Sequence, residues 1–110
     1  MIHELSASHI TQTALDLLKL QRIIAWRQHN IAPARRRNMV KKGVCDILGY
    51  EEKTGIIAAC ECKKIGDTLK DGQKKFLQGV HDNGGLALIA HQVGNHVVLT
   101  PYVEYIKKYR

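Results

Sequence analysis

The stretch GIIAACECKK, residues 55–64, decides the fold and raises the question of function. It begins with apolar residues, as a buried strand does, and then places a glutamate and a lysine in the same run. Side chains alternate along a strand, so Glu61 and Lys63 point to one face, while Cys60, Cys62 and Lys64 point to the other. The cysteines can pack into a core as small apolar residues. The two charged groups would then share a cleft.

A second isolated acid lies on the preceding strand, which is predicted over residues 44–52. Asp46 has apolar neighbours there, and the turn at residues 53–55 joins this strand to the next as a hairpin. Pairing the two strands can bring Asp46 close to Glu61. Neighbouring carboxylates repel unless a cation lies between them, and oxygen ligands favour Mg²⁺ or Mn²⁺. Lys63 could orient or deprotonate a water there, or offset charge on a phosphate.

The remaining helices and strands are predicted from the spacing of apolar residues and from residues that interrupt helices and strands. A helix is predicted from residue 6 or 8 to about 20, a strand over 22–30, a loop over 31–43 and a second helix from about 70 to 82, which Asn83-Gly84-Gly85 ends. A strand over 86–92 follows, and then a strand and a short helix. This order predicts an α/β (α+β) fold with a mixed central sheet flanked by helices. No linker divides residues 1–110, so we expect a single domain.

Composition narrows the class of partner. Lys and Arg number 17 against 10 Asp and Glu, which gives a net charge of +7 and favours nucleic acid, although a basic surface can also serve only solubility. Three cysteines are too few for a disulfide framework and indicate free thiols. No run is long enough to span a membrane and no signal peptide is recognisable, so we expect a cytoplasmic protein without a membrane partner.

A basic run and a tryptophan are candidates for nucleic-acid contact. The run RRRNMVKK is expected to follow a DNA backbone without reading its sequence. Trp26 could stack on an unpaired base, but a lone tryptophan in an apolar strand is more often part of a core. The basic side chains of the run are Arg35, Arg36, Arg37, Lys41 and Lys42.

Three segments together resemble a known family. GVCDILGY, then ACECKK, then DGQKKFLQGVHDNGGLALIA are similar to the VRR-NUC branch of the PD-(D/E)XK nucleases, which includes small stand-alone phage proteins. The shared pattern is Gly-x-x-Asp, Glu-x-Lys, a glutamine that opens a helix, and a Gly-Gly turn into an apolar strand. The resemblance covers residues 26–92 and implies a restriction-endonuclease-like αβββαβ core. Cys45 stands where the family usually has proline.

The resemblance implies roles for individual residues. Asp46 and Glu61 would bind Mg²⁺ or Mn²⁺ together with the main-chain carbonyl of Cys62. Lys63 would be the catalytic lysine, and Gln73 would close the site and place the water or phosphate. Families of this type often add an acid from the first helix, for which Glu4 is the candidate, with His9 or Gln12 as alternatives. Arg27 and Asn30 resemble the family's Arg-and-Asn element and would contact phosphate.

The activity that the resemblance implies is that of a metal-dependent DNA endonuclease, active on branched, flapped or Holliday-junction DNA in replication, recombination or repair. Stand-alone members resemble junction resolvases, which implies a homodimer and, for a phage protein, the host cytoplasm. No small-molecule cofactor is expected. A non-catalytic DNA-binding module or nuclease subunit of the same fold is the alternative, and an RNA nuclease would share the chemistry.

Simpler interpretations of the same residues exist. Asp46 could cap a turn or pair with an arginine, and Glu61 with Lys63 could form an edge-strand ion pair. A zinc site is a further alternative, but zinc ligands usually occur as closely spaced pairs in turns, which two strand cysteines do not match. The side chains considered for zinc are Cys45, Cys60, Cys62, His81, His91 and His96.

Overall fold

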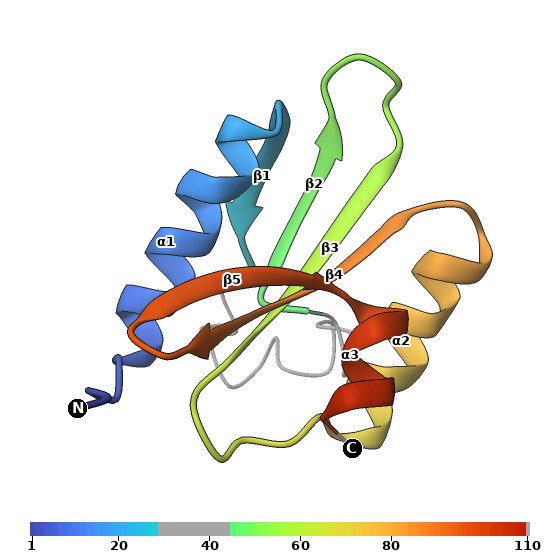
Figure 1. The fold of residues 1–110 in the computed structure, drawn as a ribbon. Coiled ribbons are helices and arrows are strands. Elements are labelled where there is room, and N and C mark those ends of the chain that lie inside the picture. The colour runs from blue at the N-terminus through green and yellow to red at the C-terminus, as the bar shows by residue number, and fades with distance from the viewer. Residues whose placement is uncertain (29–44, 110) are drawn as a thin grey trace, which may run out of the picture.

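The computed structural model describes residues 1–28 and 45–109. The elements follow the order α, β, β, β, α, β, β, α, as the sequence predicts. They are α1 (Ala7–Leu20), β1 (Ile23–Arg27), β2 (Ile47–Glu51), β3 (Ile57–Lys63), α2 (Asp71–Asp82), β4 (Leu86–Val93), β5 (His96–Pro101) and α3 (Tyr102–Lys108). Figure 1 shows α1 at one side of the sheet and α2 and α3 together at the other.

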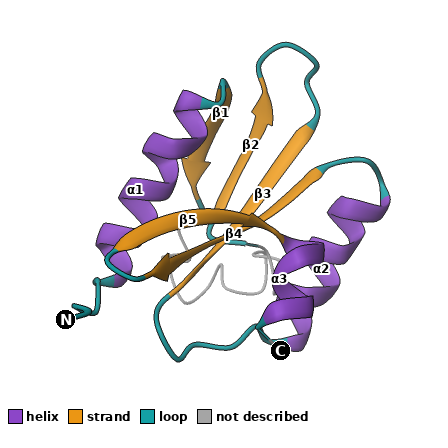
Figure 2. Ribbon diagram, in the orientation of Figure 1, coloured by secondary structure: helices purple, strands orange, loops and turns teal. Residues whose placement is uncertain are grey.

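The five strands form one mixed sheet in the order β1-β2-β3-β4-β5. Neighbouring strands are antiparallel, except that β3 and β4 are parallel and are joined through α2. The predicted hairpin of β2 and β3 is confirmed, and Ile47 lies opposite Cys60. The fold is therefore α+β, with a mixed sheet and three flanking helices (Figure 2).

Local sequence explains where the helices begin and end. Ser6 caps α1 because its hydroxyl accepts a hydrogen bond from the His9 amide, at 3.1 Å. At the end of α2, Gly84 adopts φ 84°, a left-handed conformation that glycine reaches without strain. The Gly85 amide then donates to Val80 O at 2.8 Å, and β4 begins at Leu86. The predicted Gly-Gly stop is confirmed.

The sheet separates two hydrophobic clusters. On one face, Ile10, Ala14 and Leu18 of α1 pack in a cluster that contains Cys60 of β3. On the other face, side chains of α2 and α3 pack in a cluster that contains Ala59. Successive residues of β3 therefore belong to different cores, as the alternation of a strand requires. Glu61 and Lys63 share the face of Ala59.

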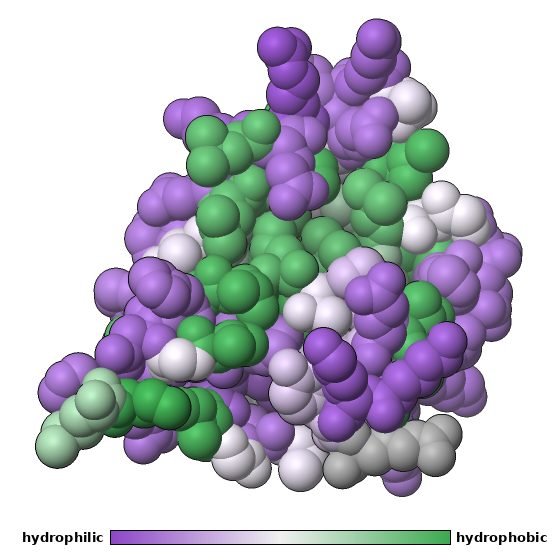
Figure 3. Space-filling model, in the orientation of Figure 1, coloured by the Kyte–Doolittle hydropathy of each residue, from purple (hydrophilic) through white to green (hydrophobic). Residues whose placement is uncertain are grey.

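The helices do not cover the whole sheet. Seen as in Figure 1, the surface has a hydrophobic area above β5, between α1 and the pair α2 and α3, with hydrophilic residues along its margins (Figure 3). Trp26 is 47% exposed, so the expectation that it belongs to the core is wrong. Its strand is a run of apolar residues, as a buried strand often is, but α2 and α3, the described helices on that face, contact β3, β4 and β5 instead. None of the described helices is long and apolar enough to cross a membrane.

Candidate active site

The site is built where β2 begins and β3 ends. The register places Ile47 opposite Cys60, which brings Asp46 beside Glu61. The Asp46 side chain reaches across to β3, where Oδ2 accepts a hydrogen bond from the Cys62 amide at 2.9 Å. The Asp46 carbonyl accepts a second bond, from the Gln28 amide at 2.7 Å. Both contacts hold this carboxylate at the end of the sheet.

Glu61 is the most unusual side chain of the site. It is 2% exposed, and its Oε1 accepts a hydrogen bond from Gln73 Nε2 at 3.0 Å. Its Oε2 is buried and has no hydrogen-bond partner in the described structure. The Asp46 carboxyl shares a hydrogen bond with Glu61 only while Glu61 is protonated. When Glu61 is ionised, its buried Oε2 has no donor, which is unfavourable for stability. A cation beside the two acids would satisfy this oxygen.

Gln73 joins the acid to the lysine. Its Oε1 accepts from Lys63 Nζ at 2.9 Å and also from the Lys70 amide at 2.9 Å, while its Nε2 donates to Glu61. The bond to Lys70 caps the first turn of α2, so the helix terminus itself fixes the amide. Lys63 is only 7% exposed, and its ammonium is held within this network. The structure thus brings together Glu61, Lys63 and Gln73, with Asp46 alongside.

The protonation of Glu61 follows from this environment. The pKa of Glu61 is raised from 4.5 to about 9: burial is the largest cause, the hydrogen bond with Asp46 and the charge of Asp46 also raise it, and the charge of Lys63 acts in the opposite direction. Without a cation, Glu61 therefore keeps its proton at neutral pH. A cation at the carboxylates would replace that proton, as expected for a pair of metal-binding acids.

The donor set fits a hard divalent cation. Asp46 and Glu61 offer carboxylate oxygens, and Glu61 Oε2 is an oxygen in need of a partner. In residues 1–28 and 45–109, no three His, Cys, Asp or Glu side chains are grouped as a metal site. The two acids therefore need main-chain oxygen or water to complete a coordination shell. The main-chain carbonyl of Cys62, which the resemblance implies as a ligand, stays a prediction.

The three cysteines do not form a common site. Cys45 packs in the cluster that contains Ala59 and donates to Ile47 O at 2.8 Å, whereas Cys60 packs in the cluster of α1. Burial raises the pKa of Cys45 to about 12, so its thiol stays protonated. In the described residues, these thiols are not grouped with other His, Cys, Asp or Glu side chains as a metal site. They serve packing on two different faces.

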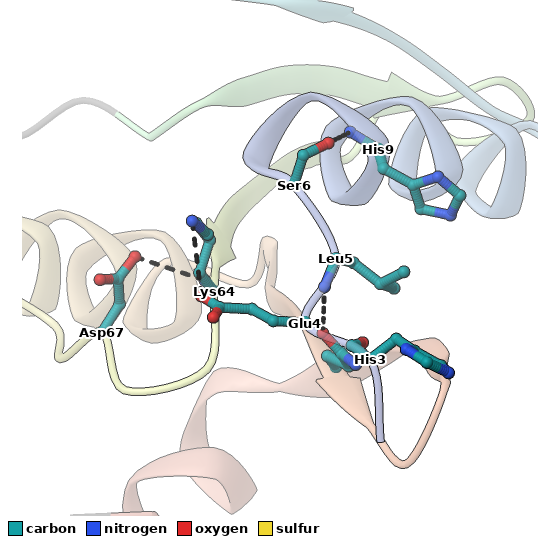
Figure 4. Close-up of polar contacts among 8 residues, drawn as sticks. His3, Glu4, Leu5, Ser6, His9, Lys64 and Asp67 are labelled. Carbon is teal, nitrogen blue, oxygen red and sulfur yellow. Dashed lines mark hydrogen bonds and ion pairs between the residues drawn. The ribbon is translucent and has the colours of Figure 1, made fainter. Parts of the chain in front are cut away.

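The three candidates for a further site residue near α1 lie apart from the network of Glu61, Lys63 and Gln73 in the described structure. Glu4 precedes α1 and pairs with Lys64, with 3.4 Å between Oε1 and Nζ, and Figure 4 shows it beside that lysine. His9 and Gln12 are exposed, and Gln12 Nε2 donates to Asp16 at 3.2 Å. Near the end of β3, the pKa of the Cys62 thiol is lowered, first by a hydrogen bond with Cys60 and to a smaller degree by a hydrogen bond with the hydroxyl of Thr11 on α1.

Among the predicted phosphate-binding residues, only Arg27 falls in the described structure. Its charge contributes to lowering the Cys62 pKa, so it lies near that end of β3. Sequence analysis missed Gln28, whose main chain holds Asp46 and whose Oε1 accepts from Trp26 Nε1 at 3.2 Å. The sequence carries no signal for either contact. Asn30, Arg35, Arg36, Arg37, Lys41, Lys42 and the loop predicted over 31–43 lie outside the described residues.

Comparison with known proteins adds no assignment. No protein-family model matches this chain, and no curated protein is significantly similar to it.

Proposed function

We propose that this protein is a metal-dependent endonuclease that hydrolyses phosphodiester bonds of DNA. The observation that carries the proposal is Glu61 Oε2, a buried carboxylate oxygen without a partner, beside a second acid and close to a buried lysine. An ordinary structural ion pair would leave no such atom, because buried charges are normally satisfied by hydrogen bonds. The resemblance of three segments to PD-(D/E)XK nucleases of the VRR-NUC branch supports the same conclusion.

Asp46 and Glu61 would hold Mg²⁺ or Mn²⁺, with the main-chain carbonyl of Cys62 as a further ligand. When bound, the cation supplies Lewis acidity toward a phosphate oxygen and a water molecule. The raised pKa of Glu61 means that cation binding releases a proton, so affinity for the cation increases with pH.

Lys63 and Gln73 act through their positions. Lys63 Nζ lies on the face of Glu61 and is directed by Gln73 Oε1, so it can donate to a phosphate oxygen and offset the negative charge that develops there. Gln73 bridges the two residues, since its Oε1 accepts from Lys63 and its Nε2 donates to Glu61. Because α2 fixes this glutamine, both groups are oriented before substrate arrives.

The net charge of +7 favours a polyanionic substrate. DNA with branches, flaps or Holliday junctions is the proposed class, in replication, recombination or repair, and a homodimer is the proposed assembly. Both rest on the resemblance alone. The alternative is a non-catalytic DNA-binding module of the same fold, which the complete set of Asp46, Glu61 and Lys63 disfavours.

Cleavage of labelled duplex, flap and four-way-junction DNA with Mg²⁺, Mn²⁺ or EDTA tests the proposal. Lys63→Ala is expected to lower the rate roughly 10²–10⁴-fold. Lys64→Ala is the matched control, because the neighbouring lysine is 40% exposed and pairs only with Glu4 in the described structure. It should cut as the wild type does.

Two results would contradict the proposal. Binding of DNA without cleavage under either metal would leave the DNA-binding module, and equal rates for the two lysine variants would remove Lys63 from the site. Competition by RNA of the same sequence would show whether DNA is the preferred substrate.

A further inference from the structure

The face of the sheet that carries Glu61 and Lys63 continues onto β1 and β2, where it is open to solvent. Trp26, Ile24 and Tyr50 are 47%, 44% and 40% exposed there. Helices α2 and α3 contact β3, β4 and β5, and these exposed side chains lie on the strands beyond them. A group of large apolar side chains exposed side by side is typical of a surface that binds a ligand or another macromolecule.

The register shows that these residues share the face of the site. Trp26 lies opposite Leu48, which lies opposite Ala59, and Ala59 is two residues before Glu61 on β3. Strands are about 4.8 Å apart and alternate residues about 6.8 Å apart, so the Cα atoms of Trp26 and Glu61 are separated by roughly 12 Å. A strand of nucleic acid with a phosphate at Glu61 reaches Trp26 within a few nucleotides.

The aromatic side chains are held in defined orientations. The rings of Trp26 and Tyr50 are 6.4 Å apart and meet edge to face at 63°. The indole nitrogen of Trp26 donates to Gln28 Oε1, so its polar atom is satisfied and the ring cannot turn freely. About half of the indole nevertheless remains in solvent. A ring that is fixed and exposed loses little entropy when a flat ligand stacks on it.

We propose that Trp26 and Tyr50 form a stacking site for an unpaired nucleobase of the nucleic acid bound at Glu61 and Lys63. The site deepens the proposed nuclease function and rests on it. Aromatic rings stack on any base, and the net charge of +7 attracts the sugar-phosphate chain. Bases inside a duplex are already stacked and cannot use the site. Within the proposed substrate class, flaps are therefore preferred over fully paired Holliday junctions, and splayed arms and single strands are preferred over duplexes.

Fluorescence tests this directly, because Trp26 is the only tryptophan in the chain. Wild-type protein in EDTA, which prevents metal-dependent cutting, is titrated with oligothymidine and with a blunt duplex of equal nucleotide number. We expect oligothymidine to quench the emission strongly and the duplex to quench it weakly. Trp26→Ala should lower the affinity for oligothymidine, followed by anisotropy of a labelled strand, about tenfold. Trp26→Phe should restore part of that affinity.

Val93→Ala is the control, since Val93 is an exposed apolar residue without a ring at the end of β4, three strands from β1 in the sheet. It should change the affinity less than twofold. Unchanged emission with oligothymidine, or equal affinities of the wild type and Trp26→Ala, would overturn the stacking site. So would a dimer in sedimentation that Trp26→Ala converts to monomer without loss of affinity, because the surface would then join two copies. Quenching without any cleavage would count against the nuclease and leave the stacking site standing.

Discussion

Strand β3 carries Glu61 and Lys63 on the face toward α2, and Cys60 and Cys62 on the face toward α1. Cys60 is fully buried, as Glu61 nearly is, yet the two residues differ in how their atoms are satisfied. Cys60 packs among aliphatic side chains of α1 and neighbouring strands. Glu61 lies in a polar network of Gln73, Lys63 and Asp46, and one of its oxygens has no partner.

Burial alone therefore does not identify a functional residue. Replacing Cys60 would remove some of the packing contacts of a core to which many residues contribute. Burying the Glu61 carboxylate, in contrast, lowers the stability of the protein while no ligand is bound. We therefore propose that the polar face binds a ligand, whereas the thiol face packs in the core. Substitutions on the polar face should mainly change activity, and substitutions on the thiol face should mainly change stability.

Glu61→Gln should have the largest effect on activity. The amide keeps the size of the side chain but removes the charge that we propose binds a cation, so cleavage with Mg²⁺ or Mn²⁺ should fall by roughly 10²–10³-fold. Steady-state cleavage of the best DNA substrate measures this loss. Retained activity in this variant would mean that the polar face is only structural.

The same residue should make stability depend on pH. Between pH 4.5 and about 9, the folded protein keeps a proton on Glu61 that the unfolded chain releases. The contribution of Glu61 to stability is complete below pH 4.5 and is lost progressively as pH rises through about 9. Urea unfolding in EDTA should therefore show a loss of several kcal/mol over this range, which Glu61→Gln reduces. Parallel pH profiles for the wild type and the variant would contradict the assignment.

Gln73→Ala should lower both stability and activity, because it removes a helix cap and the bridge between Glu61 and Lys63. We expect a loss of about 1–2 kcal/mol in stability and a lower cleavage rate. Gln78→Ala is the control on the same helix, where the side chain donates only to Asp82 in the described structure. It should change stability by less than about 0.5 kcal/mol. Equal effects of the two variants would refute the bridging role.

Cys60→Ala should show the opposite pattern. Loss of the buried sulfur leaves a small cavity beside α1 and lowers the free energy of unfolding by about 1–2 kcal/mol. Cleavage by the folded protein should be unchanged, which denaturant unfolding and activity at low temperature measure together. A large loss of activity without loss of stability would extend the site to the thiol face.

Glu4→Gln should have the smallest effect. Its ion pair with Lys64 is exposed, and such pairs contribute at most about 1 kcal/mol. Calorimetric titration with Mn²⁺ should give the same affinity as the wild type. A clear loss of affinity would instead place Glu4 among the metal ligands.

Sequence patterns predicted much of this molecule, because alternation in β3 and the turn at residues 53–55 are local properties. They separate Glu61 and Lys63 from Cys60 and Cys62, and they bring Asp46 toward Glu61 through the hairpin. The helix stop at Gly84 is local in the same sense. The exposure of Trp26 was predicted wrongly, since a strand pattern cannot tell which part of a face a helix will cover.

The amino-acid sequence by itself determined the order of the elements, the side of the strand on which each charge lies and the pairing that joins two acids. These follow from steric and hydrophobic preferences over a few residues. Only the tertiary structure decided that Gln73 touches both Glu61 and Lys63, that Glu61 Oε2 is buried without a partner, and that Trp26 stays in solvent. These depend on how α2 crosses the sheet, and packing between distant segments sets that crossing.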